Sequence, residues 1–118
     1  MMPSATSRRA PATNAEAVSR YFRVLGDATR LRIVTVLLDG ERSVSELVDI
    51  LGVPQSRVSN HLACLKWCRF VTSERRGRSI LYRLADDRIS DILRLGESAA
   101  EPNCDHLMSF SRIGPDWI

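Results

Sequence analysis

The stretch from Ser43 to Cys68 constrains the fold most, because its pattern is that of two short helices joined by a tight turn. Ser43 and Glu46 form a capping box, in which each side chain bonds the backbone amide of the other at the start of a helix. The apolar residues that follow lie on one face of a helix: Val44, Leu47, Val48 and Leu51. Gly52 comes next, at the position where a left-handed residue commonly ends a helix. The first helix is therefore predicted to end there.

A second helix is predicted from about Pro54 to Cys68, since proline is tolerated at the first helical position. Its inward stripe is expected to consist of Val58, Leu62 and Leu65. The polar residues left on its outer side cluster near its N-terminal end: Gln55, Ser56, Arg57, Ser59, Asn60 and His61. These side chains suit base edges and phosphates, and none of them is a carboxylate. They are candidate DNA contacts, with a merely solvated polar surface as the alternative.

The segment after the second helix, FVTSERRGRSILYRL, contains two runs rich in apolar and β-branched residues. Between the runs lie Arg75, Arg76, Gly77 and Arg78, so the pattern predicts a β-hairpin with a cationic tip. A recognition helix followed by a basic hairpin is typical of a winged helix-turn-helix. The fold class is therefore predicted as mainly α with a β-hairpin wing, and the three tip arginines are candidate DNA-binding residues.

Further helices are expected on both sides of this segment. Residues 1–13 are poor in apolar groups and are predicted to be a flexible tail. Asn14 is expected to cap a helix over about residues 15–25, and Asp27 a core helix that ends before Gly40. A last helix is predicted over about residues 87–100. Residues 14–100 would then form one DNA-binding and dimerisation domain, and residues 101–118 a C-terminal arm.

Length and charge narrow the functional classes. A chain of 118 residues with 44% hydrophobic content can bury one modest core, so one domain is expected. The chain lacks a run of about 18 apolar residues, and its N-terminus lacks the apolar core of a signal peptide, so a cytoplasmic protein is expected. The net charge of +3 is modest, but the cations gather around the hairpin and the second helix. Double-stranded DNA is the expected partner, and no membrane is.

The three cysteines are candidate ligands for a thiophilic ion. Cys64 and Cys68 are four residues apart on the predicted second helix, which places their Cβ atoms about 5 to 6 Å apart on one side. A disulfide needs closer Cβ atoms than a regular helix allows. Cys104 follows the helix-breaking Pro102 and could supply a third sulfur. Sulfur ligands favour Cd(II), Pb(II) or Hg(II) over Mg(II) or Ca(II). The alternative is that these thiols are small core residues.

The run from Gly26 to Asp86 resembles the ArsR/SmtB family of metal-sensing repressors, most clearly in DATRLRI, SNHL and GRSILYRL. The resemblance implies a homodimeric repressor that leaves its operator when an inducing metal binds. Two of the family's usual metal sites are missing here. Ser43 and Ser45 occupy the positions of a Cys-x-Cys pair, and Arg88 and Ala99 stand where the last-helix zinc site needs histidines, although Asp86 matches its first ligand.

The cysteine spacing itself resembles one branch of the family, the cadmium and lead sensors of the CmtR type. Carried across, the resemblance implies a metal site of Cys64, Cys68 and Cys104, with Cd(II) or Pb(II) as inducer and Hg(II) or Zn(II) as further candidates. His106 is a candidate auxiliary ligand, with a solvated surface histidine as the alternative. One departure is Arg69, which stands where relatives usually have glycine at the end of the helix.

Three hypotheses for function follow. The first is a metal-responsive transcriptional repressor that binds a pseudo-palindromic operator as a homodimer. The second keeps the DNA binding but makes the thiols a redox switch. The third is a thiol-metal interaction module that binds no operator. An enzyme is not expected, because no base, orienting carboxylate and oxyanion donors gather around His61 and Cys64 in the sequence.

Overall fold

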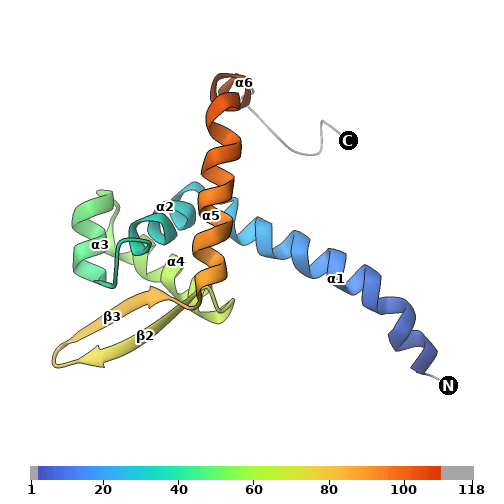
Figure 1. Cartoon of the computed structure of the whole chain (residues 1–118). Coiled ribbons are helices and arrows are strands. Elements are labelled where there is room, and N and C mark those ends of the chain that lie inside the picture. The colour runs from blue at the N-terminus through green and yellow to red at the C-terminus, as the bar shows by residue number, and fades with distance from the viewer. Residues whose placement is uncertain (1–2, 110–118) are drawn as a thin grey trace. The chain divides into compact units, whose positions relative to one another are not determined.

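The computed structural model describes residues 3–109, with side chains from Asn14 onward. The chain divides between Ala85 and Asp86 into two compact units. The first contains α1 (Pro3–Leu25), α2 (Ala28–Leu37), β1 (Arg42–Ser43), α3 (Val44–Leu51), α4 (Gln55–Trp67), β2 (Val71–Arg76) and β3 (Ser79–Leu84) (Figure 1). The second contains α5 (Asp87–Ala100), a single 3-10 turn (Glu101–Asn103) and the short helix α6 (Cys104–Met108).

The core of the first unit lies among α2, α3, α4 and the start of β2. It includes five of the inward-facing residues that the periodicity predicted: Leu47, Leu51, Val58, Leu62 and Leu65. The other two predicted residues, Val44 and Val48, are only partly buried. The buried set is Leu25, Ile33, Val34, Leu37, Leu47, Leu51, Val53, Val58, Leu62, Leu65, Phe70 and Val71. Full burial of an aliphatic or aromatic side chain contributes about 1.5 to 3 kcal/mol. The predicted inward stripe of α4 is therefore confirmed, and this packing fixes which side of α4 points outward.

Both ends of α3 form as predicted. The Glu46 amide donates to Ser43 Oγ at 3.2 Å, and the Ser43 amide donates to Glu46 Oε1 at 2.8 Å, which completes the capping box. Gly52 adopts a left-handed conformation with φ of 67°, and its amide donates to the Val48 carbonyl. Both signals depend only on residues close to them in the sequence, so they define the helix ends independently of the rest of the fold. The helix-turn-helix of α3 and α4 is confirmed.

The wing is a three-stranded antiparallel sheet with the order β1-β3-β2. The predicted hairpin is confirmed: Arg76 pairs with Ser79, so Gly77 and Arg78 form a two-residue turn, with Gly77 at φ of 60°. The strand β1 was not predicted. It pairs Arg42 with Tyr82 and Ser43 with Leu81, and two residues are too few to show strand alternation in a sequence.

The N-terminal helix is longer than predicted. The sequence pattern placed its start near residue 15 with Asn14 as the cap, whereas α1 begins at Pro3 and runs without a break to Leu25. The predicted cap at Asn14 is therefore wrong, and the flexibility of residues 1–13 stays a prediction. Intrinsic propensity does not explain the extension, because Pro11 lies in its interior and its prolines, serines and threonines outnumber its three alanines.

The second unit follows the prediction closely. Asp86 caps α5 by accepting from the Arg88 amide at 2.8 Å, and Ile89 and Leu93 are buried. The helix ends at Ala100, before Pro102, and Cys104 opens α6. The remainder of the predicted C-terminal arm, from Phe110 to Ile118, lies outside the described residues. Among the helices that the structure describes, none combines the length and the apolar content needed to cross a membrane.

Candidate nucleic-acid interface and thiol site

The N-terminal half of α4 presents the predicted polar surface. The exposed residues are Gln55, Ser56, Arg57, Ser59 and Asn60. Pro54 precedes the helix and makes no side-chain cap, so the first backbone N–H groups have no capping partner of that kind. The positive end of the helix dipole favours an anion at this end. The surface therefore combines hydrogen-bonding side chains with a preference for negative charge.

Two residues of this surface also contact the start of α2. His61 Nε2 lies 3.8 Å from Asp27 Oδ2, and His61 is half-buried rather than pointing freely outward as predicted. Arg57 Nη2 donates to Thr29 Oγ1 at 3.5 Å. A backbone hydrogen bond from Arg30 is the main cause that lowers the pKa of Asp27, with smaller contributions from the charges of Arg30 and His61. The recognition helix is thus held against α2 by polar contacts as well as by its core residues.

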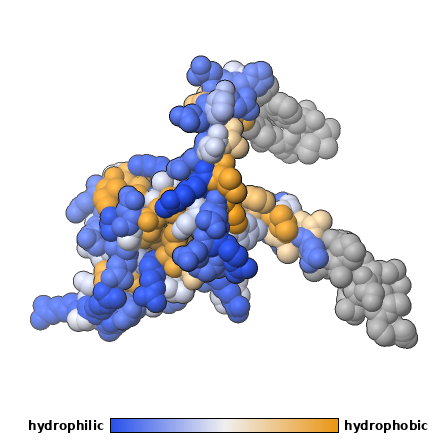
Figure 2. Space-filling view, viewed as in Figure 1, coloured by the Kyte–Doolittle hydropathy of each residue, from blue (hydrophilic) through white to orange (hydrophobic). Residues whose placement is uncertain are grey.

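The three arginines at the tip of the wing differ in their ion pairs within the described residues. Within residues 14–109, neither Arg75 nor Arg78 forms an ion pair, and both are exposed. Arg76 instead pairs with Glu41 at 2.6 Å and with Glu74 at 3.4 Å. Hydrophilic side chains cover the outer part of the wing in the space-filling view (Figure 2). The cationic tip is confirmed as a surface feature, but its three arginines are not equivalent.

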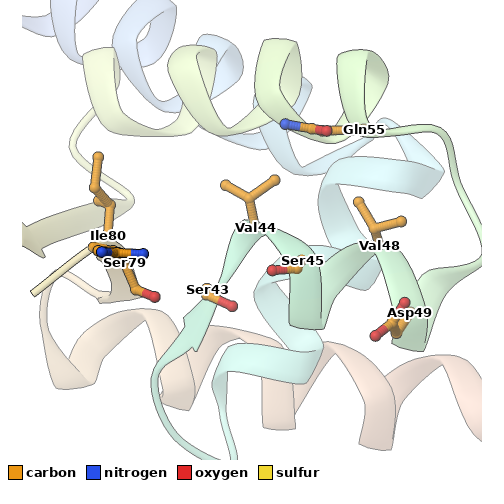
Figure 3. A pocket seen from close by; sticks show the side chains of 9 residues that line it. Ser43, Val44, Ser45, Val48, Asp49, Gln55, Ser79 and Ile80 are labelled. Carbon is orange, nitrogen blue, oxygen red and sulfur yellow. The ribbon is translucent and has the colours of Figure 1, made fainter. Parts of the chain in front are cut away.

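An open cleft of about 350 Å³ lies between the start of α3, the start of α4 and the strand β3 (Figure 3). Its polar lining comes from Ser43, Ser45, Asp49, Gln55, Arg78 and Ser79, and its apolar lining from Val44, Val48 and Ile80. Gln55 of the recognition helix and Arg78 of the wing therefore border one shared space. The part of the lining that α3 supplies could not be predicted from the sequence, because it depends on how α3 packs beside the wing.

The thiols of Cys64 and Cys68 are adjacent at the C-terminal end of α4. Cys64 is half-buried and Cys68 is exposed, so neither is a core residue. Loss of hydration is the main cause that raises the pKa of Cys68, followed by the charge of Cys64 and a hydrogen bond between the two thiols, while Arg30 lowers it. Two sulfurs at one accessible place can share a single thiophilic ion.

The C-terminal end of α4 is closed by a Schellman motif. The Phe70 amide donates to the Leu65 carbonyl at 2.8 Å, and the Arg69 amide donates to the Lys66 carbonyl at 3.0 Å. Arg69 adopts a left-handed conformation with φ of 66°, which explains why glycine suits this position. Phe70 and Leu65 are both fully buried beside it. The turn that follows the thiols is therefore tightly defined.

The positions of the family's other metal sites have structural roles here. Ser43 caps α3 through its hydroxyl. The Asp86 carboxylate is occupied by Arg88, whose Nε and Nη2 atoms lie 3.2 Å from Oδ1 and Oδ2. This side-chain contact is the main cause that lowers the pKa of Asp86. Neither position is arranged as a metal ligand in the described chain.

Cys104 belongs to the second unit, where it is exposed at the start of α6, two residues before His106. Within the described part of the chain, no group of three or more His, Cys, Asp or Glu side chains is close enough to hold a metal ion. The structure therefore brings Cys64 and Cys68 together, and the participation of Cys104 and His106 stays a prediction.

Comparison with known proteins bears on this arrangement. Residues 27–73 match the family described as bacterial regulatory protein, arsR family. The chain is 36% identical over 110 residues to a probable mercury resistance operon repressor of Streptomyces lividans, a match that covers 93% of this chain and 88% of that protein. The chain belongs to the ArsR/SmtB family. This confirms the predicted family, whose members are DNA-binding transcriptional regulators and not enzymes.

Two further similarities are to a transcriptional regulator and to a solved structure. The transcriptional regulator CmtR of Mycobacterium bovis is 43% identical over 77 residues, which covers 65% of each protein. A homodimeric winged helix-turn-helix DNA-binding domain from the same organism has a TM-score of 0.72 and 26% identity, and the match covers 89% of this chain and 94% of that one. The winged helix-turn-helix fold of this ArsR/SmtB protein is thereby confirmed.

Proposed function

We propose that the protein is a homodimeric transcriptional repressor that binds a pseudo-palindromic operator and is released from it by a thiophilic metal ion. The observation that carries this proposal is the composition of α4. One end of this helix presents an exposed polar surface suited to DNA, and the other end presents two adjacent thiols. One rigid element therefore carries both the operator contact and the ion contact.

For the operator, α4 would enter the major groove with its N-terminal residues toward the base edges. Gln55, Arg57 and Asn60 can hydrogen-bond bases, whereas Ser56 and Ser59 suit phosphates. His61 would contact DNA at the margin of the surface, because Asp27 covers part of it. Arg75 and Arg78 would hold flanking phosphates or a minor groove. The cleft between Gln55 and Arg78 leaves room for a segment of backbone between helix and wing.

Homodimer formation is supported by apolar surface on α1 and by the relatives. Val18 and Phe22 lie one helical turn apart on α1 and are 53% and 54% exposed. A helix with such a stripe needs a partner that covers it, and a second copy of the chain is the simplest one. The similar winged domain from Mycobacterium bovis is homodimeric. Two recognition helices would then occupy half-sites about one turn of DNA apart.

For the inducer, Cys64 and Cys68 would supply two sulfurs and Cys104 a third. We assign Cd(II) or Pb(II) as the inducing ion, with Hg(II) and Zn(II) as further candidates. Sulfur ligands without an evident hard oxygen ligand favour such ions. The similarity to CmtR supports a metal inducer, and the similarity to a mercury resistance operon repressor supports mercury as a competitor. Each ion must displace thiol protons, so binding should strengthen as pH rises.

Induction requires that the ion binds more tightly to the form that is off DNA. Reciprocal coupling of about 1 to 3 kcal/mol, or 5- to 150-fold in affinity, is typical of such linkage. Here the coupling would act through α4, since a shift of its thiol end on ion binding would also shift its polar end in the groove. The Schellman motif supports this coupling, because its two hydrogen bonds fix the turn between the thiols and the wing.

Gel-shift titration of an operator fragment with Cd(II), Pb(II), Hg(II) and Zn(II) tests the proposal. The wild-type complex should dissociate at a stoichiometric amount of the inducing ion. Cys64→Ser and Cys68→Ser should bind the operator normally and stay bound. Ala63→Ser is the matched control, since it places serine at an exposed neighbouring position of the same helix and should be released like the wild type. Retention of the wild-type protein at saturating metal would end the sensor proposal.

A redox switch is the second candidate, and the exposure of the Cys68 and Cys104 thiols is the observation that favours it. Oxidation would have to join cysteines of different segments or subunits, because two residues four apart on a regular helix do not reach disulfide geometry. Release by metal in the presence of a strong reductant would exclude this mechanism. Release by peroxide alone, without added metal, would support it.

A further inference from the structure

The wing contains an ion-pair cluster that joins it to the start of the helix-turn-helix. Arg76 ends β2, and its Nη1 and Nη2 atoms donate to Glu41 Oε2 and Oε1 at 2.6 and 3.3 Å. The Nη2 atom also donates to Glu74 Oε1 at 3.4 Å, as does Nη1 of Arg83. Glu41 lies 35 residues before Arg76, directly ahead of β1. The guanidinium group is thus held by carboxylates from two separate parts of the chain.

The strand register separates this cluster from the remaining cations of the tip. Side chains alternate along a strand, so Glu74 and Arg76 lie on one face of β2 and Arg75 lies on the other. Arg83 of β3 pairs with Thr72 and therefore shares the face of Glu74. The cluster has two carboxylates and two guanidinium groups, so its net charge is zero. Arg75 and Arg78 form no ion pair among the described residues, so their charge remains available to phosphate.

The location of Glu41 gives the cluster a geometric role. Glu41 precedes Arg42 and Ser43, which form β1, and Ser43 caps α3. The contact therefore ties the free end of the hairpin to the segment from which the helix-turn-helix begins. An exposed ion pair contributes little to folding stability, so its main effect is expected on the orientation of the wing. That orientation sets the distance between Arg78 and Gln55 across the cleft.

We propose that Arg76 is a positioning residue of the wing and not a DNA contact, with Glu41 as its partner, and that Arg75 and Arg78 alone supply the wing's phosphate contacts. This revises the sequence-based assignment of all three arginines, and it rests on the proposed operator binding. The two roles differ in one respect that can be measured. A phosphate contact acts through its charge, whereas a positioning contact acts through the two-pronged geometry that only arginine and a glutamate of the right length provide.

Charge-conserving variants separate the two roles. Operator affinity of the full chain is measured by fluorescence anisotropy over a range of salt concentrations. Arg76→Lys and Glu41→Asp keep every charge but lose the two-pronged contact, so each should weaken operator binding about threefold or more. The salt slope, which is the slope of the logarithm of the binding constant against the logarithm of salt concentration, should stay unchanged. The double variant should be no weaker than either single variant. Arg78→Lys, the matched control, should stay within about twofold of the wild type, because lysine still holds a phosphate.

Charge-removing variants complete the test. Arg75→Gln and Arg78→Gln should each lower the salt slope by roughly one per lost contact, or about two for a dimer, and Arg76→Gln should not. Equal loss of slope in Arg76→Gln and Arg78→Gln, with wild-type binding by Arg76→Lys, would overturn the proposal.

A second measurement needs no DNA. Amide hydrogen exchange at Arg42 and Ser43 should accelerate in Glu41→Asp, and unchanged exchange would also overturn the proposal. If the wild-type protein shows no salt-dependent specific binding, the operator proposal fails, and with it the assignment of phosphate contacts, whereas the exchange result still decides the positioning role.

Discussion

The two ends of α4 differ in their capping: the N-terminal end has no side-chain cap and is called the open end, and the C-terminal end has a Schellman motif and is called the closed end. At the N-terminal end, Pro54 offers no side-chain cap, and the side chains that follow are polar and exposed. At the C-terminal end, Arg69 and Phe70 complete a Schellman motif directly after the two cysteines. An open helix start attracts anions, while a closed helix end keeps its side chains in place. The difference fits the proposal that one helix serves two ligands, DNA at its start and a thiophilic ion at its end.

The largest expected effect comes from breaking the closed end. Phe70 is 1% exposed and packs against the Tyr21 ring at a centroid distance of 4.5 Å. Phe70→Ala should lower the free energy of unfolding by about 3 to 5 kcal/mol, because it leaves a cavity next to the Schellman turn. Urea denaturation followed by circular dichroism measures the loss. Phe22→Ala, at an exposed position of α1, is the control. It should lower the free energy of unfolding far less than Phe70→Ala at protein concentrations where the chain is monomeric.

A charge placed at the open end should affect DNA binding without affecting folding. Gln55→Glu adds a carboxylate to the first turn of α4, where it interacts favourably with the helix dipole but repels phosphate. Operator affinity should fall about tenfold or more, which is about 1.4 kcal/mol, while the melting temperature stays equal or rises slightly. Anisotropy and thermal melting on the same protein test this. Undiminished operator binding would show that the start of α4 does not face DNA.

Removing the strain at the closed end should raise stability. Arg69 holds a left-handed conformation that costs a residue with a Cβ atom about 1 to 2 kcal/mol. Arg69→Gly should therefore raise the free energy of unfolding by about 1 kcal/mol, since glycine loses part of this gain through its freedom in the unfolded chain. Chemical denaturation measures the change. Arg69→Ala is the matched comparison, because it removes the side chain but keeps the strain, and it should give no such gain.

The smallest effect concerns α3, whose capped start contrasts with the open start of α4. Hydrogen bonding to the Ser43 amide is the main cause that lowers the pKa of Glu46 below its ordinary value of 4.5. A lowered pKa in the folded state means that the ionised carboxylate stabilises the fold above pH 4.5, and that this contribution is lost as pH falls through the folded-state pKa. Glu46→Gln should remove this part of the pH dependence in denaturation curves recorded across that range. An identical pH dependence in both proteins would contradict the capping role.

The parts of the fold that sequence predicted are those with local signals. Asp27, the Ser43 and Glu46 pair, and Gly52 each act within a few residues of themselves, and each forms as expected. The strand β1 could not be predicted, because it exists only through its pairing with β3. The same holds for the candidate site. The polar surface of α4 follows from helical periodicity, but the contact between Glu41 and Arg76 joins residues 35 apart, and only the folded chain reveals it.

The central claim is that binding of a metal ion to the cysteines at the C-terminal end of α4 releases the operator from its N-terminal end. Its most direct test follows two signals in one sample during a Cd(II) titration: thiolate-to-metal absorption and the anisotropy of a labelled operator. The account predicts that both change at the same metal equivalents in the wild type and in Ala63→Ser. Cys64→Ser and Cys68→Ser should stay on the operator throughout. A wild-type protein whose thiolate absorption saturates while the operator remains bound would contradict the account.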